Sequence, residues 1–276
     1  MVRRINRVLV AVHSLETGAA AFGRGLGLGR GRRVAVPDVG AVSEALPLGD
    51  AWVQLLEPSA DGPVARFLHQ HGQGIYGIGL EVNSLADARL RVEQCGRQAH
   101  PLRLGDEELV CLKREQLPGL TVWLTESGSG PEPVDTNSPY LGVWQATNLV
   151  EDRDSAATAY EGLFGRPVRE ESFRQDEYGY LGRTLYYGQG FAADSIEIAQ
   201  VHRPQTAMGR FWQRHGPSAY MITLDTDDIA ATRRGLEARD VRFSGEAGAG
   251  YAGRVLYVHP AALAGCFTGV IAAVPA

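Results

Sequence analysis

The feature that most constrains the fold of this chain is an internal repeat. The run RFLHQHG at residues 66–72 is echoed by RFWQRHG at 210–216. A tyrosine stands four residues after each final glycine, at Tyr76 and Tyr220, and the runs LEV at 80–82 and LDT at 224–226 follow. The match needs no gap. It therefore indicates a duplicated domain, and we expect two similar halves.

Each half divides again into two similar units. In each unit a short apolar strand leads into a helix whose first residue follows a serine or an aspartate. Their side-chain oxygens can accept hydrogen bonds from the free N–H groups of the first helical turn. Short strand-like runs follow each helix, so the unit has the order strand, helix, several strands. It recurs at a period of roughly 70 residues.

Composition limits the classes of partner. The formal net charge is -5, and a surface of that sign repels phosphate backbones, so nucleic acid is not an expected partner. No apolar run approaches the roughly 18 residues needed to cross a membrane. The basic start is not followed by the apolar stretch of a signal peptide, so we expect a cytoplasmic protein. The three cysteines lack the paired spacing of a disulfide framework or a zinc cage.

Domain boundaries follow from a segment rich in serine, glycine and proline. The run SGSGPEP at 127–133 favours neither strand nor helix. We therefore predict a first domain at 1–126, a linker at 127–141 and a second domain at 142–276.

Two segments carry a resemblance to a known family. The sequence QLLEP at 54–58, PVARFL at 63–68 and GQGIYGI at 72–78 resembles the methylmalonyl-CoA epimerase type of the vicinal oxygen chelate superfamily. HP at 259–260 with GCFTG at 265–269 is similar to that family's final hairpin. The resemblance covers nearly the whole chain. It implies an α+β fold of four βαβββ modules, which form two glyoxalase-like domains with cupped mixed sheets. Whether modules pair within one chain or in a homodimer stays open.

The resemblance also implies where a divalent ion would lie. In the superfamily, the first strand and a late strand of each module supply metal ligands on the concave face of the cup, and the ion polarises substrate oxygens. The matching positions, module by module, are Arg7 and Gln54, Gly77 and Trp123, Gln145 and Glu197, and Met221 and Gly269. No pairing of modules gives a full ligand set. We therefore predict no metal and no other cofactor, with a divalent metal at an atypical site as the alternative.

Gln145 and Glu197 form the one glyoxalase-like half-set and are the candidate catalytic residues. They could be half of a metal site, or an acid/base carboxylate with an amide partner. The alternative is a polar pair that faces a wet cleft and has no chemistry.

Further positions are candidates for ligand binding. A buried cation needs an anionic partner, so Arg7 either reaches a protein carboxylate or binds an acidic group of a ligand. We favour ligand contact for Trp123 and space filling for Trp144, which strand alternation turns to the face opposite Gln145. The candidate ligand-binding residues are Arg7, Gln54, Tyr76, Trp123, Tyr220 and Met221.

Other conspicuous residues receive structural interpretations. His71 and His215 each precede a repeated glycine, and we expect them in turns outside the cups with surface or turn-stabilising roles. Arg30, Arg32 and Arg33 are expected in a solvated turn. The run at 178–183 is expected to form a hairpin turn, with a mobile flap over the second cup as the alternative.

Three functions remain open at this point. The first is binding of a small aromatic or acyl molecule in one or both cups without the usual metal. The second is a divalent-metal-dependent lyase, isomerase or epimerase. The third is a non-catalytic scaffold or partner-binding protein. Cups filled by side chains favour the scaffold, whereas an open pocket with convergent polar groups favours ligand binding.

Overall fold

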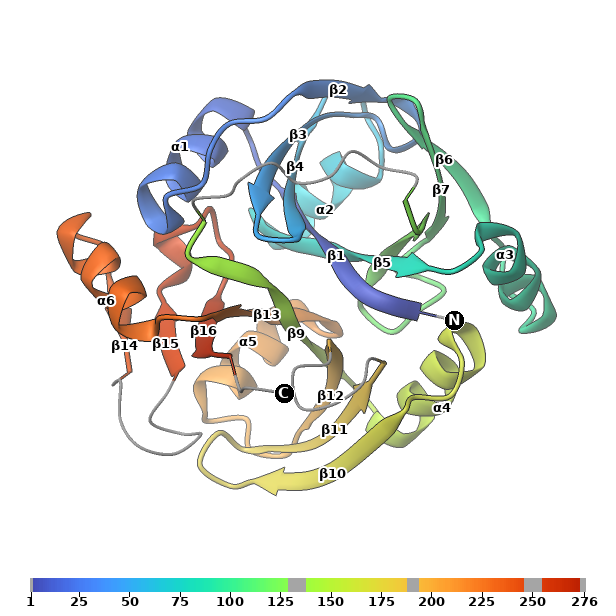
Figure 1. Cartoon of the computed structure of the whole chain (residues 1–276). Coiled ribbons are helices and arrows are strands. Elements are labelled where there is room, and N and C mark those ends of the chain that lie inside the picture. The colour runs from blue at the N-terminus through green and yellow to red at the C-terminus, as the bar shows by residue number, and fades with distance from the viewer. Residues whose placement is uncertain (1, 129–137, 188–193, 246–254, 274–276) are drawn as a thin grey trace.

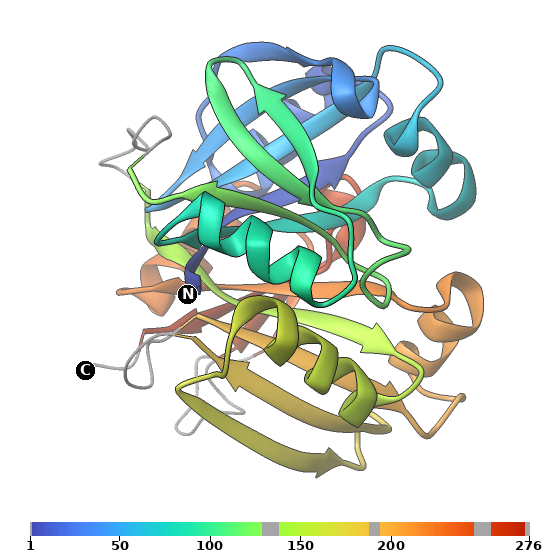
Figure 2. The same cartoon turned by 90° about the vertical axis from the view of Figure 1, so that its right-hand side faces the viewer.

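The computed structural model describes residues 2–128, 138–187, 194–245 and 255–273, and its two halves are two curved mixed sheets with helices (Figures 1 and 2). Most of the predicted linker, 129–137, lies outside the described residues. Sheet A has the strand order β2-β3-β4-β1-β5-β8-β7-β6, and sheet B has the order β10-β11-β12-β9-β13-β16-β15-β14. The two orders are equivalent, as the sequence repeat predicts.

The strands of sheet A are β1 Val2–Ala11, β2 Arg33–Val36, β3 Ala41–Leu48, β4 Ala51–Pro58, β5 Gly74–Val82, β6 His100–Leu104, β7 Glu107–Leu112 and β8 Thr121–Glu126. Those of sheet B are β9 Tyr140–Val150, β10 Arg169–Gln175, β11 Tyr180–Tyr186, β12 Ser195–Val201, β13 Ser218–Thr226, β14 Phe243–Ser244, β15 Val255–Val258 and β16 Thr268–Ala272. The helices are α1 Leu15–Leu26, α2 Pro63–His71, α3 Leu85–Gln94, α4 Arg153–Phe164, α5 Ala207–His215 and α6 Ile229–Ala238.

The predicted α+β fold of four βαβββ modules is confirmed. Each module runs strand, helix, three strands, beginning at β1, β5, β9 and β13. Modules one and two share sheet A through the antiparallel pair β1–β5, and modules three and four share sheet B through β9–β13. The modules therefore pair within the chain, and the first strands of each pair lie at the centre of their sheet.

Polar caps start three of the four module helices as predicted. Ser84 accepts a hydrogen bond from Asp87 N, Asp152 from Ser155 N and Asp228 from Ala231 N, at 3.1, 2.7 and 2.8 Å. The hydroxyl of Ser14 makes no such bond, and Leu15 N donates instead to Glu57 Oε2 on β4, at 2.6 Å. The caps fix where each helix leaves its sheet.

The segments that join the modules are helices, and the expectation of a turn outside the cup was wrong. Figure 1 shows α2 within the curve of sheet A and α5 within the curve of sheet B. In α2, Pro63 occupies the first turn, where its missing N–H costs nothing. Val64, Phe67 and Leu68 then fall on one helical face and are buried inside the first cup. Each connecting helix therefore contributes apolar side chains to the interior of a cup.

One apolar core spans both halves. It joins residues of the outer face of sheet A, such as Val8 and Val53, to residues of sheet B such as Ile222 and Leu224, and it includes side chains of α1 and α4. Backbone contacts tighten this junction. A Cβ atom at Gly119 (φ +72°) would lie 2.2 Å from the carbonyl carbon of Pro217, so only glycine fits there. The concave faces of the sheets lie on the sides away from this core.

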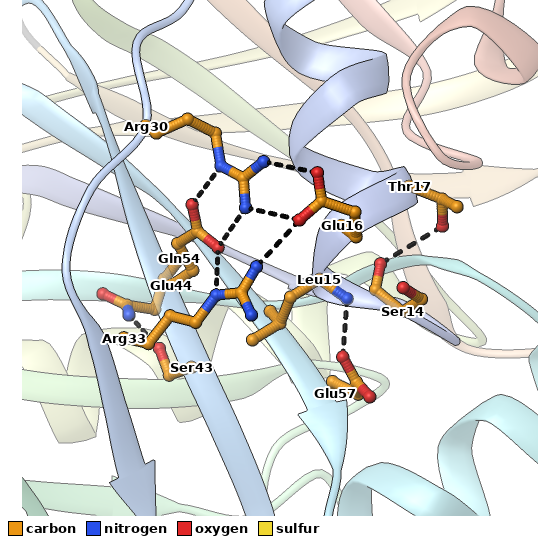
Figure 3. A network of polar contacts seen from close by, with 10 residues as sticks. All are labelled: Ser14, Leu15, Glu16, Thr17, Arg30, Arg33, Ser43, Glu44, Gln54 and Glu57. Carbon is orange, nitrogen blue, oxygen red and sulfur yellow. Dashed lines mark hydrogen bonds and ion pairs between the residues drawn. The ribbon is translucent and has the colours of Figure 1, made fainter.

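A charged network holds the junction of α1 and β2 on sheet A (Figure 3). The carboxylate of Glu44 on β3 is buried and accepts hydrogen bonds from Arg30 and Arg33. Glu16 of α1 pairs with the same two guanidinium groups from the solvent side. Arg30 and Arg33 are therefore counter-ions of a buried carboxylate, whereas the sequence suggested a solvated turn. Among the described residues, no helix is long and apolar enough to cross a lipid bilayer.

A partly buried carboxylate bridges the two halves. Asp194, just before β12, accepts a hydrogen bond from the backbone N–H of Ile5 at 2.5 Å, where β1 is bulged. Burial raises the pKa of Asp194 well above its usual value, and the negative charges of Asp50 and Asp225 add to that effect. Because the folded-state pKa is raised, the stability that Asp194 contributes is present at low pH and is lost as the pH rises through that value.

We predict that Asp194→Asn stabilises the protein at pH 7, since the amide oxygen can still accept from Ile5 N without a buried charge. The gain should be lost at about pH 3, below the ordinary pKa of aspartate, where the wild-type carboxyl binds a proton in both states. Urea unfolding at the two pH values measures it, with the exposed Asp61→Asn as the control for charge alone. Equal unfolding midpoints of wild type and Asp194→Asn at pH 7 would contradict the prediction.

Candidate functional site

The eight family positions lie on the strands that form the middle of each sheet. The first-strand positions are on β1, β5, β9 and β13, and the late-strand positions are on β4, β8, β12 and β16. Within sheet B, Gln145 lies opposite Ser195, and Thr147 lies opposite Glu197. Because side chains two residues apart share a face, Gln145 and Glu197 point to the same, concave side of the sheet.

The first cup is filled by its own side chains. Leu9, Leu56, Phe67 and Trp123 belong to one buried apolar cluster on the concave face of sheet A. Trp123 is fully buried and faces Cys111 across the β7–β8 pair. Tyr76 lies in the same cluster with its ring edge against Phe67 at 5.3 Å. Trp123 and Tyr76 are thus packed as core residues, and ligand contact by either stays a prediction.

Arg7 has a protein carboxylate as its partner. Its Nη2 atom lies 2.6 Å from Oε2 of Glu107, and both side chains are almost completely buried, at 3% and 6% exposed. The pair balances the buried charge, so the geometry does not require an acidic ligand at Arg7. Hydrogen bonding is less complete, because Arg7 Nε and Nη1 and Glu107 Oε1 meet no partner in the described part of the chain.

Gln54 is also engaged within the first cup. Its amide nitrogen donates to the hydroxyl of Ser43 on the neighbouring strand β3 (Figure 3). This pair leaves the Gln54 side chain turned along the sheet. Ligand binding by Gln54 has no direct support from this arrangement and stays a prediction.

Glu197 is the central polar group of the second cup. Its two carboxylate oxygens accept hydrogen bonds from Tyr180 Oη and Thr147 Oγ1, both at 2.7 Å. Thr147 is its neighbour on β9, and Tyr180 comes from the start of β11. Burial raises the pKa of Glu197, and the two hydroxyl donors offset part of that increase. The carboxyl is 5% exposed.

No cation balances Glu197 in the described residues. Desolvation and the hydroxyls of Tyr180 and Thr147 are the influences on its pKa, and no guanidinium or ammonium contributes. A buried carboxylate without a counter-ion lowers stability, and such groups concentrate at functional sites. In this respect the second cup differs from the first, where Arg7 neutralises Glu107.

The remaining second-cup positions offer little for a metal ion. The Gln145 amide nitrogen donates to Ser195 Oγ at 3.2 Å, Met221 offers a weak thioether, and Gly269 has no side chain. Within the ranges that the structure describes, no three His, Cys, Asp or Glu side chains gather in one place. Glu197 with the amide oxygen of Gln145 would give two protein ligands, fewer than catalytic metal sites use. The donor set therefore does not fit the metal centre that the superfamily implies.

Aromatic side chains surround the carboxylate. Burial, first of all, and nearby negative charges that include Glu197 raise the pKa values of Tyr186 and Tyr257. Tyr257 stacks on Phe267 at 5.8 Å, and the edge of Tyr220 meets Phe267 at 5.4 Å. Tyr257, Phe267 and Tyr220 therefore form a continuous aromatic surface that begins near Glu197 at Tyr257, and an apolar surface near an acidic group suits an acyl or aromatic ligand. The hairpin β10–β11 turns at 176–179, so Tyr178 and Gly179 of the run at 178–183 lie in the turn and the rest of that run belongs to strand β11.

Trp144 lies on the concave face, and the expectation that it faces away was wrong. The pairing of β9 with β13 skips one residue, because Gln145 pairs with Thr223 and Val143 with Leu224. This bulge places Trp144 beside Val255, Ile271 and Tyr257. A bulge re-aims a side chain in a way that strand alternation cannot reveal.

The partners of Glu197 and Arg7 are the functional residues that the sequence did not reveal. Glu107 is 100 positions from Arg7, and Tyr180 is 17 positions from Glu197. The parallel pairing of β9 with β12 places Thr147 opposite Glu197, whereas Tyr180, which lies opposite Val201, reaches the carboxylate along the sheet through its long side chain. The tyrosine-rich run that begins at Tyr178 was the available signal.

Comparisons with known proteins agree with this architecture. No model of a known protein family matches the chain. Over 98 residues the chain is 35% identical to an ethylmalonyl-CoA/methylmalonyl-CoA epimerase from Cereibacter sphaeroides, and the match covers 35% of this chain and 73% of that protein. At that identity and coverage the chain belongs to the same family, the vicinal oxygen chelate superfamily.

Solved structures share the tandem arrangement. A triple mutant of 4-hydroxymandelate synthase from Streptomyces coelicolor aligns with 100% of this chain and 94% of its own, with a TM-score of 0.75 and 17% identity. A fusion of a xylose isomerase-like TIM barrel with 4-hydroxyphenylpyruvate dioxygenase aligns with 99% of this chain and 49% of its own, with a TM-score of 0.66 and 16% identity. At such low identity, these likenesses concern the fold alone.

The Arg7–Glu107 pair generates a prediction about stability. Arg7→Met alone should cost about 3–5 kcal/mol, because it leaves a buried carboxylate without its cation. Glu107→Leu alone should cost a similar amount. The double variant should lie close to wild type, since neither charge remains. Urea unfolding of the four proteins measures the coupling, and additive single effects would contradict the prediction.

Proposed function

We propose that the protein binds a small acyl or aromatic molecule in its second cup and that Glu197 exchanges a proton with it or anchors a polar group of it. The observation that carries the proposal is a buried carboxylate that meets no cation among the described residues and is held by Tyr180 and Thr147 near tyrosine side chains. In this proposal the first cup is a structural domain, because its family positions are paired with protein groups or buried in its core.

The polar groups around Glu197 define its role. Tyr180 and Thr147 each donate a hydrogen bond, so they hold the carboxyl group in one orientation towards the cup. The raised pKa brings the carboxyl closer to the range in which a group both accepts and returns protons near neutral pH. Gln145 lies on the same face and could bind a ligand oxygen through its amide.

The test is a binding and exchange assay on Glu197 variants. Thermal-shift screening with propionyl-CoA, methylmalonyl-CoA and 4-hydroxyphenylpyruvate finds a ligand that raises the melting temperature, and NMR in D₂O follows loss of its α-proton. We expect Glu197→Gln to reduce the exchange rate by about 100-fold or more, typical of a lost general base. Tyr180→Phe should slow the exchange less, because it removes only a positioning hydrogen bond.

The exposed Glu177→Gln is the matched control for the loss of one negative charge. If ligand binding and exchange survive unchanged in Glu197→Gln while that protein remains folded, the proposal is wrong. A pH series adds an independent readout. Because the folded-state pKa of Glu197 is raised, wild-type stability relative to Glu197→Gln should fall as the pH rises through that value.

A second candidate is a divalent-metal-dependent epimerase, isomerase or lyase. The match to an ethylmalonyl-CoA/methylmalonyl-CoA epimerase favours it, whereas the donor set described above counts against it. We predict that protein purified without chelator holds less than one equivalent of Mg, Mn, Fe, Co, Ni or Zn by elemental analysis. One tightly held equivalent, together with metal-stimulated epimerisation of methylmalonyl-CoA, would establish this candidate instead.

A further inference from the structure

A cavity of about 420 Å³ lies where the two copies of the repeated motif meet. It is bounded by the last turn of α2, by the length of α5, by the first residues of β5 and β13, and by Pro260, Gly265 and Phe267. A volume of several hundred Å³ is typical of small-molecule sites. Neither Glu197 nor Tyr180 lines this cavity, although Tyr220 and Phe267, which belong to the aromatic contacts near Glu197, do.

The cavity has an aromatic wall built by the repeat. His71 and His215 approach each other with ring centroids 5.8 Å apart and an interplanar angle of 33°. Each imidazole also lies against the phenylalanine one turn earlier on its own helix, at 4.9 Å from Phe67 and 4.4 Å from Phe211. Four rings from two helices therefore form one surface, and such a surface suits a flat ligand.

The described lining of the cavity carries positive charge but no negative charge. Arg214, on the exposed face of α5, lines it together with the two histidines, and its described lining contains no aspartate or glutamate. The guanidinium of Arg114 stands over the ring of Phe67 at 5.6 Å, behind the cavity wall. Glu115 acts on Arg114, so Arg214 is the guanidinium of the lining that an anion in the cavity can meet.

The imidazoles can act as neutral hydrogen-bonding groups. Burial, with help from the Arg114 charge, lowers the pKa of His71 to about 4, and burial with Arg214 and Arg114 lowers that of His215. At pH 7 each ring therefore offers one N–H donor and one acceptor. The Nδ1 atom of His71 is buried and meets no partner among the described residues.

We propose that this interdomain cavity is a second ligand site, which binds a planar aromatic molecule bearing one carboxylate. The rings of Phe67, Phe211 and the histidines stack on the aromatic part, and Arg214 pairs with the carboxylate. The site sits on the contact between the two domains, so an occupied cavity joins α2 of the first domain to α5 of the second. It does not depend on the function proposed for Glu197.

The probe is 1-naphthoate, with 1-naphthalenemethanol as the uncharged comparator, titrated by calorimetry into the full chain. We expect the acid to bind more tightly than the alcohol. Arg214→Gln should weaken 1-naphthoate about tenfold, the effect of one charge-assisted hydrogen bond, and leave the alcohol unchanged. Arg24→Gln, an exposed arginine of α1 away from the cavity, is the charge-matched control.

Ala207→Phe localises the site. Ala207 is exposed at the first turn of α5 and lines the cavity, so a larger side chain should obstruct it without entering the core. Both ligands should then bind at least about tenfold more weakly. Circular dichroism checks that the variant folds, and Arg214→Gln provides the independent arm.

Three results would overturn the proposal. The first is no binding of 1-naphthoate to wild type. The second is equal affinity for the acid and the alcohol. The third is retained 1-naphthoate binding in folded Ala207→Phe with loss in Glu197→Gln, which would place the acid in the second cup. A failure of the Glu197 experiments does not affect any of these measurements.

Discussion

The apolar core shared by the two sheets is the constraint on which the rest of the molecule depends. Val8 and Val53 of one sheet belong to the same buried cluster as Ile222 and Leu224 of the other. The outer faces are committed to this contact and to the helices. The Glu197 site accordingly lies on a concave face, and the cavity of about 420 Å³ lies along the seam between the domains. The backbone N–H of Ile5 in the first half donates a hydrogen bond to the carboxylate of Asp194 in the second half, so this contact also depends on the shared core.

The same backbone produces two different cups. In both, the central first strand carries a bulge, which turns Asn6 towards the interior of sheet A and Trp144 towards that of sheet B. In the first cup, Arg7 and Glu107 form a buried ion pair, and apolar side chains fill the rest of the interior. In the second cup, the partners of Glu197 among the described residues are the hydroxyl groups of Thr147 and Tyr180. The two halves therefore share one architecture, whereas the charged groups in their cups have different partners.

The fold could be predicted from the sequence because repetition and capping are local signals. Ser84 and Asp152 mark helix starts by chemistry that needs no tertiary contact. The arrangement of the site was harder to predict from the sequence. The bulge at Trp144 reverses the side that alternation predicts, and the Glu107 partner of Arg7 is distant in sequence. The nine residues of α2 are short enough that a turn and a helix have similar signatures, and only burial of their apolar face decides between them.

The equivalence of the two halves places the two copies of one motif side by side and so creates an arrangement that neither half contains alone. A motif at equivalent positions of two related domains meets its own copy wherever it lies near the symmetry axis, as His71 meets His215. Taken singly, each histidine ends a helix beside a glycine and has an ordinary structural explanation. Together with Phe67 and Phe211 they make a wall, and the cations nearby come from both domains, since Arg114 belongs to one and Arg214 to the other. A site of this kind exists only while the domains stay docked, and a ligand bound there therefore favours the docked arrangement by the free energy of its binding.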